Sequence, residues 1–227
     1  MSTEEEWLFN KGKIIGFDIP EGVQLPIFVI GDSHVRVLPE VAPDIFCRST
    51  DIEDVIDSKS AYAVGTKGHD VYLNESIRVI PDGSQVLLSF GEIDCRHYVY
   101  PKSQERNITI EQMVDEIIAR YTVNCIRLLK EKFKVAILGS YMCPDDVNHE
   151  NPYLKIFEAK ILFNQKIKQY CEDNNMVYVP IFKKSLEEQW HKFEGEYPHY
   201  FNDSSHLGPC MIPEILNAIA SYGVLKS

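Results

Sequence analysis

Short continuous runs of apolar residues recur along the chain, and most of them end at a glycine or another turn residue. Runs of this length between turn signals are typical of strands that are buried on both faces of a sheet. The predicted strands are Leu25–Ile30, Ile45–Cys47, Gln85–Phe90, Val135–Leu138 and Met176–Phe182.

Longer segments between these strands carry apolar residues three and four positions apart, which is the spacing of an amphipathic helix. Segments 109–132, 153–174 and 211–222 show it, and Thr109 is the expected N-cap of the first, with Gln112 completing a capping box. In segment 153–174 the expected buried stripe is Leu154, Phe157, Ile161, Phe163, Ile167 and Tyr170. The alternation of strands and helices predicts an α/β fold in which helices cover both faces of a central parallel sheet.

The pattern indicates one folded domain. Residues 1–24 are polar and form an expected irregular lead-in, and residues 25–227 contain no repeat, linker or second core. Gly31, Gly91 and Gly139 each follow a predicted strand directly. Because ligands of such sheets bind beyond the carboxyl ends of the strands, we expect these glycines to rim one crevice.

Composition and charge narrow the classes of function. Hydrophobic residues make up 44% of the chain, and 34 acidic against 23 basic residues give a net charge of −11, which disfavours nucleic acid and anionic membranes as partners. The N-terminus lacks the features of a secretory signal, so we expect a cytoplasmic protein whose six scattered cysteines are reduced. The histidine and cysteine spacings do not fit a metal site, and no nucleotide-binding loop occurs, so neither a metal nor a cofactor is expected.

The first candidate for chemistry is Gly31-Asp32-Ser33-His34, which follows the first predicted strand. A glycine after a buried strand lets the backbone turn sharply, and a serine at the start of the next helix exposes its hydroxyl where the helix N-terminus favours negative charge. Ser33 is therefore a candidate nucleophile. The alternative is that Ser33 only caps that helix.

The second candidate is Asp203-Ser204-Ser205-His206, which precedes the last predicted helix. A carboxylate three residues before a histidine can orient one ring nitrogen and leave the other free to take a proton from a serine. Each motif is weak alone, since a loop histidine is more often a surface or capping residue. Together they suggest a serine acyl-transfer triad.

With these two motifs in this order, the chain resembles the SGNH-hydrolase (GDSL-type) superfamily from Ile27 to Tyr222. The first block of that superfamily is Gly-Asp-Ser after the first strand, and its last block is Asp-x-x-His before the C-terminal helix. The resemblance implies a flavodoxin-like three-layer fold and hydrolysis of an ester, often on carbohydrate or lipid. It implies Ser33 as nucleophile, His206 as base, Asp203 as its orienter, and an oxyanion hole to which Ser33 and Gly65 contribute, with Gly68 as a rival to Gly65.

The third block departs from the superfamily pattern. It usually reads Gly-x-Asn-Asp, with the asparagine amide as an oxyanion donor, whereas this chain has Ile93 at that position within Gly-Glu-Ile-Asp-Cys-Arg, a variant that resembles some members. Losing one such donor typically costs about 10²–10³ in rate. Arg96 is the expected replacement, with His97 as a second possibility. The alternative for Arg96 is a structural ion pair with Asp94 or Glu92.

The remaining candidates would contact substrate. His34 and Arg36 follow the expected nucleophile, and Glu92, Asp94 and His97 belong to the third block. Arg36 falls near the same helix face as Ser33 one turn on, although it could equally lie on a solvated face. The leading expectation is an esterase that removes an O-acyl group, expected to be acetyl, from a carbohydrate or related small molecule. Acyl transfer through the same triad, or glycan or partner binding by a catalytically weak protein, are the alternatives.

Overall fold

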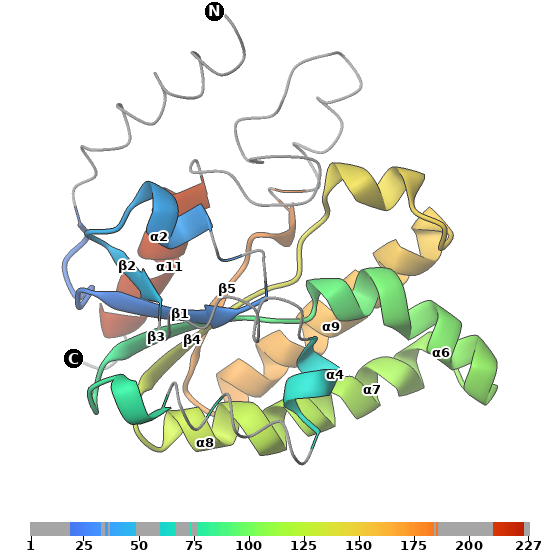
Figure 1. Ribbon diagram of the computed structural model, residues 1–227, viewed down its shortest axis with the longest axis horizontal. Coiled ribbons are helices and arrows are strands. Elements are labelled where there is room, and N and C mark those ends of the chain that lie inside the picture. Colours follow the sequence, from blue (N-terminus) through green and yellow to red (C-terminus); the bar gives the residue numbers. More distant parts are fainter. Residues whose placement is uncertain are drawn as a thin grey trace, which may run out of the picture.

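Among the residues that the structure describes, five strands form one parallel sheet in the order β2-β1-β3-β4-β5 (Figure 1). The computed structural model describes residues 19–32, 35, 37–48, 60–66, 73, 77–183, 185 and 211–224. The strands are β1 (Ile27–Gly31), β2 (Phe46–Arg48), β3 (Gln85–Ser89), β4 (Lys134–Leu138) and β5 (Val177–Val179). Each strand begins within two residues of the position at which the sequence predicted a strand to begin.

The strand order creates a switch point between β1 and β3. The chain passes from β1 to β2 on one side, whereas β3 pairs with the other side of β1, with Gly31 opposite Ser89. This is the flavodoxin-like order, in which ligands bind at the carboxyl ends of the two strands that flank the switch point. The segments that follow β1 and β3 are therefore the first place to look for a site.

Helices cover both faces of the sheet, as predicted. One face carries α4 (Ala61–Val64), α9 (Tyr153–Asp173) and a continuous helical stretch of α7 (Ile110–Tyr121), the π-helix η4 (Thr122–Ile126) and α8 (Arg127–Lys130). The other carries α2 (Val37–Val41) and α11 (Ile212–Val224) (Figure 1). Thr109 caps α7 with the expected capping box to Gln112.

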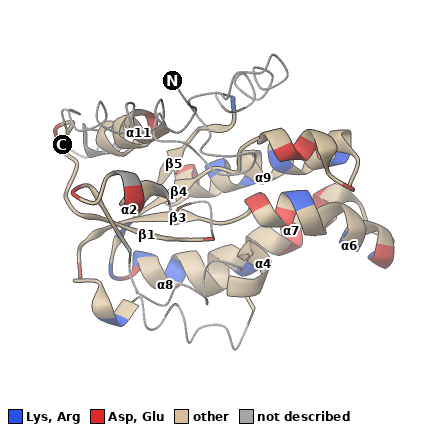
Figure 2. Ribbon diagram, turned by 45° about the horizontal axis from the view of Figure 1, so that its top comes forward, with Lys and Arg blue, Asp and Glu red and all other residues tan. Residues whose placement is uncertain are grey.

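Alternate residues of the strands supply two separate cores. Ile30, Leu88 and Ile137 pack with α7 and α9, whereas Val29 and Leu87 pack with α2 and α11. Charged residues lie mostly on the helices and are sparse on the strands (Figure 2). Within the part of the chain that is described, no helix combines the length and apolarity that crossing a bilayer requires.

The buried face of α9 differs from the expected stripe. Leu154 is 72% exposed, and Phe157, Ile161 and Tyr170 are only partly buried. Phe163 and Ile167 of the expected stripe are buried, and the other buried positions are Ile156, Ala159, Lys160, Asn164 and Cys171. An apolar pattern does not reveal this face because it includes the polar residues Lys160 and Asn164. Their side chains donate hydrogen bonds to Tyr141 O and Ser140 O, beyond the carboxyl end of β4.

A helical segment after β3 was not predicted. Residues 92 and 93 are helical, and the π-helix η3 (Asp94–Tyr98) and α6 (Val99–Arg106) continue from them. In η3 the consecutive residues Asp94, Cys95 and Arg96 are all buried. An α-helix rarely buries three residues in a row on one face, and the wider π turn, which is frequent at functional sites, accommodates them.

Candidate active site

Two described segments meet at the switch point. Asp32, directly after β1, is fully buried, and its backbone N–H donates to Ser89 O at the end of β3 (3.1 Å). Gly91, Glu92 and Ile93 follow β3, and Glu92 is also buried. The carboxyl ends of β1 and β3 are thus joined just where the predicted nucleophile follows in the chain.

The predicted triad lies outside the described residues: Ser33, Asp203 and His206, together with His34, Arg36 and Gly68, are not among them. Residues close to them in the sequence are described. Val35 and Met211, two residues after Ser33 and five after His206, belong to the same hydrophobic core, on the α2 and α11 face of the sheet. The residues that follow the two motifs therefore pack in the same layer of the fold, between the sheet and helices α2 and α11.

Gly91 brings helix α9 close to the end of β3. Its φ is +113°, and an added Cβ would lie 2.6 Å from Cε1 and 2.8 Å from Cε2 of Phe163 on α9. Only glycine adopts this backbone conformation without strain and leaves room for the ring. Phe163 follows Lys160 by one helical turn, so the same close approach carries Lys160 to Glu92.

Asp94 caps helix α4 from outside the helix. Its carboxylate accepts hydrogen bonds from the backbone N–H groups of Ala61 (2.6 Å) and Tyr62 (3.0 Å), which lack partners within the helix. Complete burial raises the pKa of Asp94 to about 6, although these bonds oppose the shift. These contacts give Asp94 a structural role as the cap of α4, and its expected contact with substrate stays a prediction.

The raised pKa predicts how Asp94→Asn changes stability with pH. A group whose folded-state pKa lies above its unfolded value stabilises the fold below the unfolded pKa, and this contribution is lost as pH rises through the folded pKa. The free energy of unfolding of the wild type relative to Asp94→Asn should therefore fall between pH 4.5 and 7.5, by about 2 kcal/mol. Urea unfolding across this range measures it, and a flat or rising difference would contradict the assignment.

Gly65 also makes contacts other than the expected one. Its N–H donates to Ala61 O (3.1 Å) as the C-cap of α4, and its carbonyl accepts from Asn124 Nδ2 (2.6 Å). An added Cβ would lie 2.7 Å from the backbone of Arg120 in α7. A glycine is needed here because α4 and α7 pack too closely to leave room for a Cβ atom. The N–H group of Gly65, which would have to donate to an oxyanion, already donates to Ala61 O.

Arg96 forms the ion pair that was the alternative to an oxyanion role. Its Nε lies 3.2 Å from Glu92 Oε1, and its Nη1 lies 3.7 Å from Cys143 Sγ and 3.8 Å from Asp145 Oδ2. Burial alone would lower the pKa of Arg96, but Glu92 and the other acidic neighbours raise it. The side chain thus reaches toward the segment after β4, whereas β1, the strand that precedes Ser33 in the sequence, lies on the opposite side of β3.

Lys160 is the centre of this charged cluster and is a site residue that the sequence pattern did not predict. The buried ammonium lies 3.1 Å from Glu92 Oε1, and 2.9 and 2.7 Å from the two Asp146 oxygens, and it donates to Tyr141 O (2.7 Å). Burial opposes its charge, but Asp146 and Glu92 raise its pKa above the ordinary lysine value. The signal in the sequence was a lysine spaced with the apolar residues Ile156 and Phe163.

The acidic residues of the cluster have the chemistry of metal ligands. Potential ligand atoms of Glu92, Cys143 and Asp146 lie within 4.8 Å of one another. However, Lys160 Nζ contacts both carboxylates at 3.1 and 2.7 Å, so the ammonium supplies the positive charge that a cation would bring. The donor set as it stands fits a lysine better than a metal ion.

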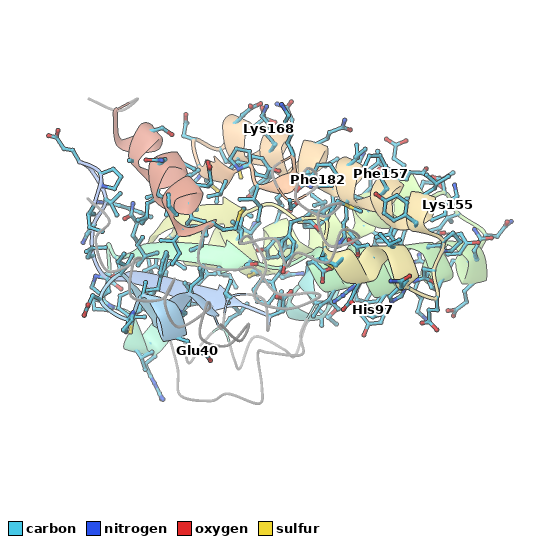
Figure 3. All side chains as sticks on the ribbon, turned by 90° about the horizontal axis from the view of Figure 1, so that it is seen from above. Glu40, His97, Lys155, Phe157, Lys168 and Phe182 are labelled. Carbon is cyan, nitrogen blue, oxygen red and sulfur yellow. The ribbon has the colours of Figure 1, made fainter. Side chains whose placement is uncertain are left out.

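His97 lies at the rim of the carboxyl edge and pairs with His149 (Figure 3). His149 Nδ1 accepts the backbone N–H of Asn151 (3.0 Å), so neutral His149 carries its proton on Nε2, which lies 3.0 Å from His97 Nδ1. Burial and the neighbouring Arg96 lower the pKa of His97. His97 thus joins η3 to the segment after β4 and remains exposed.

Three aromatic rings pack together on α9 and the segment after β5. The rings of Phe157 on α9 and Phe182 after β5 (Figure 3) are 5.9 Å apart. Tyr153 stacks on Phe157, with 6.2 Å between the ring centroids. All three are partly exposed. Aromatic rings in such a position can pack against apolar groups or sugar rings.

The fold has counterparts among solved structures. No protein-family model and no curated protein matches the chain. A protein from Bacteroides fragilis assigned as an acylhydrolase is 14% identical and aligns over 95% of this chain and 94% of its own, with a TM-score of 0.54. An α/β hydrolase enzyme from the metagenome of Lake Arreo, Spain (13% identity, 88% and 95%, TM-score 0.45) and TesA (14% identity, 86% and 96%, TM-score 0.41) are more distant. The chain therefore has the three-layer fold of a protein assigned as an acylhydrolase.

Proposed function

We propose that this protein is a serine hydrolase of the SGNH type that cleaves O-acyl esters. The observation that carries the proposal is the place of Gly31-Asp32-Ser33 in the chain: Gly31 is the last residue of β1, at the switch point of a flavodoxin-like sheet, and Asp32 and Ser33 follow it in the sequence. Ligands of such sheets bind at that point. The assignment of the Bacteroides fragilis protein as an acylhydrolase agrees with it.

In this proposal Ser33 attacks the acyl carbon and His206 takes its proton, while Asp203 orients the imidazole. The acyl group passes to Ser33, the alcohol leaves with the proton from His206, and water then releases the acid. The shared core of Val35 and Met211 supports the approach of the two motifs, because both motifs adjoin the same layer.

The oxyanion that forms in this reaction needs hydrogen-bond donors. Ile93 has no side-chain donor, and Gly65 and Arg96 are engaged elsewhere. The helical backbone after Gly91 begins at Glu92, so N–H groups of its first turn have no partner within the helix, and its N-terminus favours negative charge. We infer that these backbone groups act with the Ser33 N–H.

The proposed substrate is an O-acetyl ester of a carbohydrate or related small molecule. A triad with a reduced oxyanion hole still acylates on an activated ester, because a good leaving group needs less stabilisation of the oxyanion. We expect slow but measurable hydrolysis of p-nitrophenyl acetate. Ile93 also favours a second candidate, a glycan-binding protein that has lost most activity, and the absence of turnover by folded protein would support that candidate instead.

Ile93→Asn restores the donor that the superfamily pattern places at this position. Ile93 is only partly buried, so the substitution should be tolerated. We expect kcat for p-nitrophenyl acetate to rise about tenfold, because an added oxyanion donor acts mainly in the transition state. An unchanged or lower kcat in folded Ile93→Asn would mean that other groups already fill the donor position.

A further inference from the structure

Burying the charged ammonium group of Lys160 costs free energy, because the group is removed from water. The residue lies on the buried face of α9 between Ile156 and Phe163, and its side chain has no exposed surface. Replacing buried ion pairs with apolar residues of similar size is often neutral or stabilising. Stability alone therefore does not explain why a lysine occupies this position. Its contacts with two different segments at the carboxyl edge of the sheet do explain it.

These contacts join the segment after β3 to the segment after β4. Lys160 reaches Glu92 on the first segment, and Tyr141 O and Asp146 on the second. Glu92 Oε1 also faces Arg96 Nε at 3.2 Å, so two cations hold one carboxylate oxygen. Glu92 directly follows Gly91, whose contact with Phe163 fixes the distance of α9 from this point.

We propose that Lys160 is a positioning residue that, through Glu92, fixes the helix start after β3 where the oxyanion forms. The inference rests on the proposed function. Lys160 itself does not touch substrate: it acts by holding the backbone of residues 92–94 in place. Displacing a catalytic group by about 1 Å can cost about 10²-fold in rate. Loosening Glu92 should therefore lower kcat and leave substrate binding largely unchanged.

Glu92→Gln is the main test, because Lys160 keeps its two Asp146 contacts and Tyr141 O in this variant. We expect kcat for p-nitrophenyl acetate to fall roughly 10- to 100-fold, with KM within about threefold of the wild-type value. Glu92→Asp is the second variant. It keeps the charge beside Lys160 but shortens the side chain by one methylene, and should lower kcat with a smaller change in melting temperature.

Asp146→Asn is the matched control, since it removes the other carboxylate partner of Lys160 at unchanged volume. Asp146 lies after β4, one strand farther from the switch point, so this variant should lose more melting temperature and less kcat than Glu92→Gln. Amide hydrogen exchange should rise in residues 92–98 of Glu92→Gln, and this readout does not depend on activity.

The outcomes separate the inference from the proposed function. A wild-type kcat in folded Glu92→Gln, or parallel losses of kcat and melting temperature in the Glu92 and Asp146 variants, would overturn the positioning role. If the wild type shows no Ser33-dependent turnover, the proposed function fails and the catalytic role of Lys160 fails with it. Hydrogen exchange would then still report whether Glu92 holds residues 92–98.

Discussion

Ser33→Ala is expected to lower kcat/KM for p-nitrophenyl acetate by at least about 10³-fold, because the acyl-enzyme cannot form without the nucleophile. The fold should persist, since the backbone N–H groups of the neighbouring Asp32 and Val35 donate to Ser89 O and Asp32 O. Initial rates and melting temperatures of both proteins measure the effect.

Ser140→Ala is the matched control for this substitution. Ser140 is a buried serine at the carboxyl end of β4, away from the switch point. It should keep the wild-type rate. Equal rates in wild type and Ser33→Ala would remove Ser33 from the mechanism. If Ser140→Ala lowered kcat/KM as much as Ser33→Ala does, any disturbance of the carboxyl edge of the sheet would be enough to lower activity.

Gly91→Ala is expected to lower the free energy of unfolding by about 3–5 kcal/mol, because strain from positive φ adds to overpacking against a buried ring. The added Cβ would lie 2.6 Å from Cε1 of Phe163, and α9 shares a buried core with β3 and β4. Urea unfolding monitored by circular dichroism gives the change in stability.

Gly83 offers the control for Gly91. Its φ is +83°, and an added Cβ would meet nothing within 4 Å. Gly83→Ala should therefore show the backbone strain alone, about 1–2 kcal/mol. Similar losses in the two variants would mean that the packing of Phe163 against Gly91 contributes little to stability.

The strands were predictable because most of them are continuous apolar runs that end at a turn residue, as with Gln85–Ser89 before Gly91. Their order followed only from the resemblance, since a parallel sheet brings distant segments together without a local signal. The helix over residues 94–106 was missed because its π turn buries Asp94 and Arg96, which read as surface residues in any α-helical pattern.

The polar side of the site was harder to predict than its glycines. A strand followed directly by glycine indicated the carboxyl edge correctly, but nothing local showed that Asp94 would cap α4 or that Arg96 would face Glu92. Lys160 lies 68 residues from its partner Glu92. Such pairings depend on tertiary packing, which here is set by the contact between Gly91 and Phe163.

The most direct test of the central claim is covalent labelling with a fluorophosphonate probe, which reacts with activated serine nucleophiles. Intact-mass measurement followed by peptide mapping locates the adduct, with Ser33→Ala and His206→Ala labelled in parallel. The proposed function predicts one adduct, on Ser33, which is absent in Ser33→Ala and forms more slowly in His206→Ala. Folded wild-type protein that takes up no probe, or takes it up at another residue, would contradict it.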